Sequence, residues 1–509
     1  MIFTGLKRPV SEPAETGVAA GSAGSAGGQA DPARRLASIG AGVAGAVRAW
    51  PRSLADWAAG RAVAPNSVTG ISLLLALCAA AWFSGGTASD NLSGTVALAG
   101  WWLSRGVARR MAVAPARSGF GGTASGPARS STDWLVLPGF TWSDGDVADL
   151  PDIAVGGDSE RRFNWLAVSC STAAECAMYG GIAAGGAAAG WAGMWPLAVA
   201  TITCVSVAET VSACCPAGAA GAPGNVRAHV PDEVWGRVLT WFARIRRPSA
   251  GLRVLVAGLG LAVHGPRVAL VSVLAVPVLS ACLAVASRAA RRGHASGAPA
   301  DGDCLADQAR LNVVLASRDD GAVARWAGRL VQGNLAPLPP AVAAIIALTM
   351  LASLGMGKLP GVIALAPIMA MLLAAPGSSH PHDGRVDWLV PALLCAGQYL
   401  YLAALGFAWS VPGPVIFAAC SLTAIWHASL AGSAPAAAEA PADRKEQVAR
   451  IISRPADGIG WEARMFAVAI AGMLGLAAFG YLGVTAYLGV LIGRKAVAGS
   501  LLPTEDVRQ

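Results

Sequence analysis

The feature that most constrains this chain is a series of apolar segments, each close to the length that crosses a lipid bilayer. Twelve such segments pair into six hairpins: 66–86 with 91–104, 164–187 with 192–213, 252–264 with 266–288, 340–356 with 359–376, 386–408 with 411–430, and 464–480 with 482–500. A spanning helix needs about 20 apolar residues, and it satisfies its own backbone hydrogen bonds where water is absent. The sequence therefore predicts an all-α, polytopic membrane protein with about 12 transmembrane helices.

The overall composition excludes an ordinary soluble domain. Hydrophobic residues make up 54% of the 509 positions and charged residues only 13%, whereas about 25% of a soluble domain is charged. Most of the ten cysteines lie inside apolar segments. They are therefore expected to be small core residues and not a disulfide framework.

The loops predict the orientation. The connections near 87–90, 188–191, 409–410 and 481 contain no Lys or Arg, whereas the longer connections contain many. Because positively charged loops stay in the cytoplasm, both termini and the long loops are predicted to be cytoplasmic, in a multi-pass protein of the cell membrane. The net charge of +8 then reflects this topology and an attraction to anionic membrane lipids, and nucleic acid is not an expected partner.

Four regions follow from the pattern of apolar and polar stretches. Residues 1–40 are rich in Gly, Ala, Ser and Pro, which predicts a disordered cytoplasmic tail. Residues 41–292 and 338–509 each contain six apolar segments, and the polar stretch 293–337 is predicted to be a cytoplasmic linker. Within the first domain, residues 41–62 place apolar side chains at helical spacing with arginines between them, as an interfacial helix does.

A weak internal repeat supports two six-helix halves. Trp165-Leu166 is followed ten residues after the Trp by Glu175, and Trp388-Leu389 is followed at the same spacing by Gln398. A short stretch that begins with Arg-Ile and ends in Arg-Pro also precedes an apolar hairpin in each half. Similarity between halves is the usual sign of an internal duplication.

Several motifs resemble a known family. Ala64-Pro65-Asn66-Ser67-Val68-Thr69 opens the first segment and resembles the Thr-Pro-Asn-x-Val-Thr start of the CDP-alcohol phosphatidyltransferases. The stretch from Asn164 through Glu175 is similar to that family's third helix. Residues 386–509, with Gly460-Trp461-Glu462-Ala463-Arg464, resemble a hydrophobic domain of unknown function that follows such transferases in bacteria.

The resemblance implies a set of substrate-binding residues. These would be Pro65, Asn66, Thr69 and Glu175, with a CDP-linked lipid or alcohol as the ligand. Enzymes of this family hold the diphosphate of a CDP-activated alcohol through divalent metal ions on clustered aspartates, and CMP leaves when a second alcohol attacks phosphorus.

This sequence departs from the family at the aspartates. When the chain is aligned on Trp165 and Glu175, two family aspartates fall on Ala167 and Ser171, and Arg105 takes the place of another. Without carboxylates, Mg²⁺ has no hard anionic ligands and the attacking hydroxyl has no base. No catalytic residue is therefore assigned, and the chain is interpreted as a non-catalytic, diverged member that acts in phospholipid-related binding or regulation.

Two alternatives stay open. Asp144, Asp146 and Asp149 form an acidic cluster in the loop before the third segment, and they could rebuild a Mg²⁺ site for an active CDP-alcohol phosphotransferase of phospholipid biosynthesis. The two similar halves also suit a two-repeat transporter. The sequence also leaves open whether the protein forms a homodimer.

Overall fold

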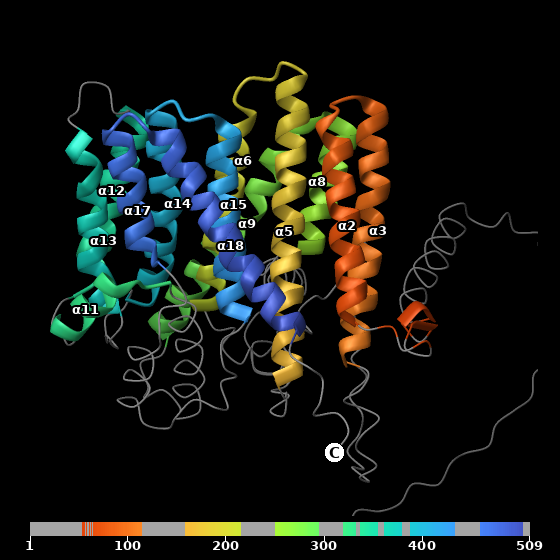
Figure 1. Cartoon of the computed structure of the whole chain (residues 1–509), viewed down its shortest axis with the longest axis horizontal. Coiled ribbons are helices and arrows are strands. Elements are labelled where there is room, and N and C mark those ends of the chain that lie inside the picture. The colour runs from red at the N-terminus through yellow and green to blue at the C-terminus, as the bar shows by residue number, and fades with distance from the viewer. Residues whose placement is uncertain are drawn as a thin grey trace, which may run out of the picture. The chain divides into compact units, whose positions relative to one another are not determined.

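In a computed structural model of the chain, the described residues are 53–55, 57–58, 61, 63, 65–113, 158–214, 250–294, 319–331, 336–354, 361–378, 387–432 and 459–501. The chain divides into two units, Met1–Trp50 and Pro51–Gln509, and all described residues belong to the second. Every regular element among them is a helix (Figure 1). The all-α prediction is thus confirmed for this part of the chain.

The helices follow the predicted apolar segments closely. In order they are α2 (Pro65–Ser84), α3 (Ala88–Val113), α5 (Asp158–Ala188), α6 (Met194–Cys214), α8 (Ala250–His264), α9 (Pro266–His294), α11 (Ala322–Val331), α12 (Leu338–Leu354), η2 (Gly361–Ala364), α13 (Leu365–Ser378), η3 (Asp387–Leu389), α14 (Val390–Ala408), α15 (Gly413–Gly432), α17 (Trp461–Met473) and α18 (Ala477–Leu501). Each predicted segment is covered for most of its length by one helix, and the segment 464–480 also reaches the first turn of α18. The sequence predicted 91–104 for α3 and 164–187 for α5. Helix α3 continues past this range to Val113, and helix α5 begins earlier, at Asp158; both extensions contain charged residues.

Six of the described helices are long and apolar enough to cross a membrane. They are α2, α6, α9, α14, α15 and α18. Helices α8, α12 and α13 are apolar but shorter, and α3 and α5 carry more charge than a simple span. The structure therefore agrees with a helical, membrane-embedded protein.

Neighbouring helices turn back sharply at one end of the bundle. Gly265 alone separates α8 from α9, with φ of 89°, and Gly475 between α17 and α18 has φ of 75°. Only glycine adopts such angles without a steric penalty. The tight connections at this end, 85–87, 189–193, 265, 409–412 and 474–476, contain no Lys or Arg.

The opposite end of the bundle is basic. Arg105 and Arg110 lie in the last turns of α3, and Lys495 lies near the end of α18. The Lys495 ammonium donates to the backbone oxygen of Ser429 at 3.1 Å and lies 5.5 Å from the ring centroid of Trp165. The repeat marker Trp165 therefore contacts a cation that belongs to this end.

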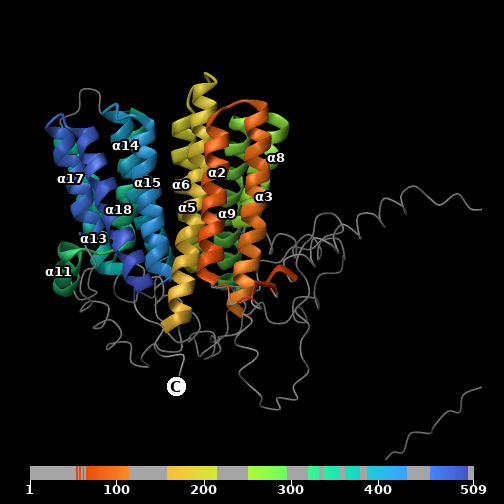
Figure 2. The same ribbon diagram turned by 45° about the vertical axis from the view of Figure 1, so that its right-hand side comes forward.

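The helices of the two predicted domains pack directly against each other. Helix α5 contacts α15, and α6 contacts α14 (Figures 1 and 2). The Phe417 ring of α15 lies against α5 at Gly180, where an added Cβ would meet the ring at 2.9 Å. One continuous apolar core thus joins residues before 292 with residues after 386.

A second apolar cluster is built from α11, α12, α13, α14 and α17. The sequence had assigned α11 to the polar linker. Glu462 fixes its start, because the backbone N–H groups of Gly321 and Ala324 donate to the Glu462 carboxylate at 3.0 and 3.2 Å. A carboxylate satisfies the otherwise unpaired N–H groups of a first helical turn and interacts favourably with the helix dipole.

The described part of residues 41–62 is also helical and packs on the bundle. Ala55 and Ala58 are buried with Val68 of α2 and Met111 of α3. Trp57 stays exposed, and the Arg61 guanidinium lies 4.2 Å from the centroid of its ring system. An exposed aromatic ring beside a cation is typical of a membrane interface.

Two glycines bring α2 and α5 into close contact. A Cβ added at Gly181 would lie 2.4 Å from the backbone oxygen of Ala80, and one at Gly185 would lie 2.0 Å from that of Phe83. Small residues four positions apart allow membrane helices to approach this closely.

We expect Gly185→Ala to destabilise the protein by about 1–3 kcal/mol, because the new methyl group overlaps a backbone oxygen that cannot rotate away. The matched control is Gly70→Ala in α2, whose Cβ would meet nothing within 4 Å. Thermal unfolding of the purified protein in detergent should show a lower Tm for Gly185→Ala only. Equal Tm values for the two variants would contradict this packing.

Candidate functional site

A cavity of about 170 Å³ lies where the hairpin of α5 and α6 meets the hairpin of α14 and α15. It is lined by the later turns of α6 and α15 and by the first half of α14, so it lies toward the basic end of the bundle. Its carboxyl, amide and imidazole side chains are Glu175, Glu209, Asp319, Asp320, Gln398 and His427.

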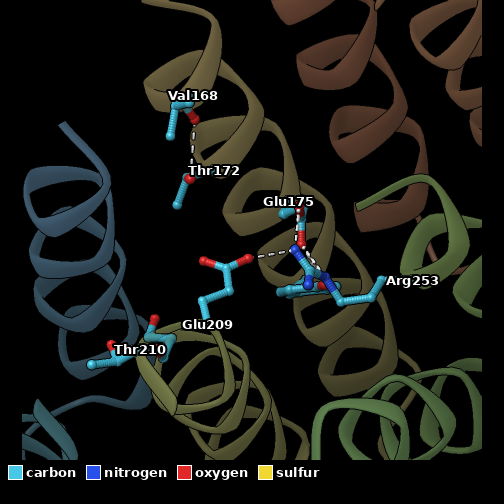
Figure 3. A network of polar contacts seen from close by, with 8 residues as sticks. Val168, Thr172, Glu175, Glu209, Thr210 and Arg253 are labelled. Atoms are coloured by element: carbon cyan, nitrogen blue, oxygen red, sulfur yellow. Dashed lines mark hydrogen bonds and ion pairs between the residues drawn. The ribbon is translucent and has the colours of Figure 1, made fainter. Parts of the chain in front are cut away.

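A buried ion-pair network forms one wall of this cavity (Figure 3). Arg253 of α8 and Glu175 of α5 are each only 4% exposed. Arg253 Nε donates to Glu175 Oε2 at 2.8 Å, and Nη2 donates to Glu175 Oε1 at 3.0 Å and to Glu209 Oε1 at 2.7 Å. Three helices, α5, α6 and α8, are thereby joined by one guanidinium.

The network satisfies Glu175 fully. Both of its oxygens accept from Arg253, and the Tyr179 hydroxyl also donates to Oε2 at 3.1 Å. A lone charge inside a membrane costs about 2.5–3.5 kcal/mol on insertion scales, and pairing offsets this cost. Glu175 therefore acts first as the counter-charge of Arg253.

Glu209 is used differently. Only its Oε1 contacts Arg253, and its side chain is 51% exposed although α6 is surrounded by other helices. The exposed area faces the cavity, which Glu209 lines. Its carboxylate is thus accessible to a ligand from the cavity side.

Gln398 and His427 complete the opposite wall. Gln398 of α14 is 8% exposed, and its Oε1 has no hydrogen-bond partner among the described residues. A buried carbonyl oxygen left without a donor costs about 1–3 kcal/mol. Beside it, the hydroxyl of Tyr399 lies 3.3 Å from Nδ1 of His427.

The segment just before α11 forms part of the cavity wall at the basic end. The Trp461 backbone N–H donates to the backbone oxygen of Asp319 at 3.0 Å, and Trp461 Nε1 donates to Asp320 Oδ1 at 2.9 Å. Arg464 forms an ion pair with Asp319. Hydrogen bonds and an ion pair from the motif Gly460-Trp461-Glu462-Ala463-Arg464 therefore hold this segment and α11 against the start of α17.

The surroundings of Asp319 raise its pKa. Burial raises the pKa from 3.8 to about 6, although the positive charge of Arg464 acts in the opposite direction. Desolvation outweighs the ion pair because the carboxylate loses nearly all contact with water.

The substrate-binding residues expected from the family resemblance do not gather at the cavity. Glu175 lines it, whereas Asn66 and Thr69 in the first turns of α2 do not. Asn66 is exposed and Thr69 is buried. Pro65 begins α2.

The expected metal residues Asp144, Asp146 and Asp149 lie outside the described residues. Within the part that the structure describes, no three His, Cys, Asp or Glu side chains form a group that could hold a metal ion. The described residues thus do not fit the Mg²⁺ of the resembled family. Comparison with known proteins gives no further guide, since no protein-family model, curated protein or solved structure matches the chain.

Glu175 and Glu209 lie within the apolar segments 164–187 and 192–213, which predicts that both face protein or a water-filled cavity, and their contacts with Arg253 agree with this prediction. Sequence reasoning missed Arg253, although an arginine within the apolar segment 252–264 was a usable signal, since a charge in a span needs a partner. Asp319 and Asp320 gave no such signal in the polar stretch before α11.

We expect Arg253→Ala to destabilise the protein by about 3–5 kcal/mol, because two carboxylates lose their shared counter-charge. Arg267→Ala, an exposed arginine of α9, is the matched control and should leave the Tm nearly unchanged. Adding Glu175→Leu to Arg253→Met should recover part of the loss. Similar Tm values for Arg253→Ala and Arg267→Ala would show that the network is not stabilising.

We expect the raised pKa of Asp319 to make stability fall as pH rises. The folded state holds the Asp319 proton up to about pH 6 and the unfolded state only to about 3.8, so the contribution is complete below 3.8 and lost through pH 6. The difference corresponds to about 2–3 kcal/mol. Between pH 4 and 7 the Tm of the original protein and of Asp90→Asn should fall by this contribution, whereas the Tm of Asp319→Asn should lack that fall. An unchanged dependence of Tm on pH in Asp319→Asn would contradict the assignment.

Proposed function

We propose that this chain is a non-catalytic, diverged relative of the CDP-alcohol phosphatidyltransferases that binds a small ligand within the membrane, in a phospholipid-related binding or regulatory role. One observation carries the proposal: both oxygens of Glu175 are engaged by Arg253. At other family acid positions stand Arg105, Ala167 and Ser171. None of these three can supply the anionic ligands that a divalent metal requires.

The size of the cavity supports a ligand smaller than a CDP-linked lipid. Its volume is about 170 Å³, whereas sites for drug-sized ligands enclose about 300–1,000 Å³. The wall beside Arg253 also offers no spare positive charge for a diphosphate, since that guanidinium is shared by two carboxylates. A CDP-linked ligand would need a different site.

The same proposal includes twelve membrane-spanning helices in two six-helix halves. Helices α5 and α14 carry the repeat positions Glu175 and Gln398, and both side chains line the cavity. Helix α5 packs on α15, and α6 packs on α14. The first helix of each hairpin therefore contacts the second helix of the other, as expected of two hairpins related by a twofold axis. Arg253 and Arg464 are each the fourth residue of the helix that opens the last hairpin of a half.

The basic end of the bundle supports a cytoplasmic location for both termini in the cell membrane. Arg105 and Arg110 of α3 and Lys495 of α18 lie there, and the tight connections that the structure describes at the other end carry no Lys or Arg. Positive residues are retained on the cytoplasmic side during insertion. Bilayer lipids are then the immediate partners of the exposed apolar side chains.

A two-repeat transporter is the second candidate function. The observation that favours it is the position of the cavity between the α5–α6 and α14–α15 hairpins. Transporters built from repeats bind their substrates at the repeat interface. Flux of a labelled ligand into proteoliposomes distinguishes a carrier from a static binding protein.

We expect purified protein to release no CMP from CDP-diacylglycerol in the presence of Mg²⁺ and a panel of acceptor alcohols, because the described residues offer no metal site. An active transferase in the same micelles serves as the positive control. Robust release that is abolished by Asp144→Ala but not by Asp152→Ala would instead establish an active phosphotransferase with a rebuilt acidic site.

A further inference from the structure

We propose that the cavity between the α5–α6 and α14–α15 hairpins binds a small organic cation, whose protonated amine is held by Glu209 and Gln398. This inference deepens the proposed function, on which it rests, by naming the chemical class of the ligand. It follows from the charge of the cavity wall, from its unpaired acceptors, and from its size.

The charge of the wall favours a cation. Among the described residues that line the cavity are four carboxylates, Glu175, Glu209, Asp319 and Asp320, and no lysine or arginine. Arg253 and Arg464 offset part of this charge through ion pairs, and the positive charge of Arg105 also acts on Glu209. A bound cation would offset the remainder, since opposite charges attract strongly where water is scarce.

The unpaired acceptors favour a donor such as an ammonium group. Gln398 is more than nine-tenths buried and lines the cavity, and its Oε1 has neither a partner among the described residues nor surface open to a water-sized probe. A bound donor therefore turns this amide toward the cavity. Glu209 uses Oε1 for Arg253 and presents the rest of its exposed carboxylate to the cavity. An ammonium has three donors and no acceptor, so it complements both groups.

The remaining wall favours an organic cation over a metal ion. Ile202, Val205 and Leu394 line the cavity with apolar side chains, and Tyr399 adds an aromatic one. No three metal-ligating side chains come together within the described residues. The volume of about 170 Å³ equals about five to six water molecules, which suits an amine with a short hydrocarbon chain.

The test compares three probes of the same shape: butylammonium, butanol and butyrate. We expect butylammonium alone to stabilise the purified full-length protein in a saturable way, as measured by Tm and by isothermal titration calorimetry. In Glu209→Gln the affinity should fall at least about tenfold, because a charge-assisted hydrogen bond is lost. The glutamine still offers an oxygen to Arg253, so the network is retained.

Two further variants guard against an effect on folding. Gln398→Met keeps the wall charge and removes the unpaired acceptor, so it should weaken butylammonium binding while leaving the Tm without ligand at or above the original value. Asp90→Asn removes an acid outside the cavity wall and should bind butylammonium normally. Equal binding of butanol, preference for butyrate, or unchanged affinity in Glu209→Gln would each overturn the proposal.

Competition measurements in two kinds of nanodisc identify the source of the amine. Competition by phosphatidylethanolamine in nanodiscs, with phosphatidylglycerol nanodiscs as the control, would identify a lipid headgroup, and its absence would identify a free amine. Displacement of butylammonium by equimolar K⁺ would overturn the proposal in favour of an inorganic cation. CMP release refutes the proposed function and lack of amine binding refutes this inference, so the two failures are distinguishable.

Discussion

The structure depends above all on keeping one arginine charged inside an apolar bundle. Arg253 is 4% exposed, so α5 and α6 must each present a carboxylate to it, and both do so within 3.0 Å. This requirement fixes the rotation of three helices about their axes. It also explains why Glu175, the residue most suggestive of the transferase family, has both oxygens engaged, while Glu209 retains a face toward the cavity.

The cavity lies where the α5–α6 hairpin meets the α14–α15 hairpin, with α5 packed on α15 and α6 packed on α14. The two hairpins are not in contact along their whole length. Elsewhere the contact is close, as at Gly180 of α5 against the Phe417 ring of α15. Toward the basic end, the cavity separates parts of α5 and α6 from α14 and α15, and the polar side chains of its wall bind each other or face the cavity. Burial of these groups is acceptable only if a partner or a ligand satisfies them.

The segment before α11 and the start of α17 contribute part of the cavity wall. Glu462 caps α11, while Trp461 and Arg464 hold the two aspartates that precede it. Helix α11 exposes Val323, Trp326 and Leu330, an apolar stripe suited to an interface. The motif that resembles the appended bacterial domain therefore has a structural role here, and it connects the cavity wall to a surface helix.

The sequence by itself determined the helices, since hydropathy and length mark every long one, and it predicted that the glutamates of α5 and α6 face protein or a cavity. It could not find the partner of those glutamates, because Arg253 lies 78 residues from Glu175 and no local pattern records such a pairing. It also read 293–337 as linker, since the polarity of that stretch conceals α11. Only the tertiary structure decided which carboxylate is fully engaged and which is exposed to the cavity, because that depends on how helices rotate against each other to satisfy a buried charge.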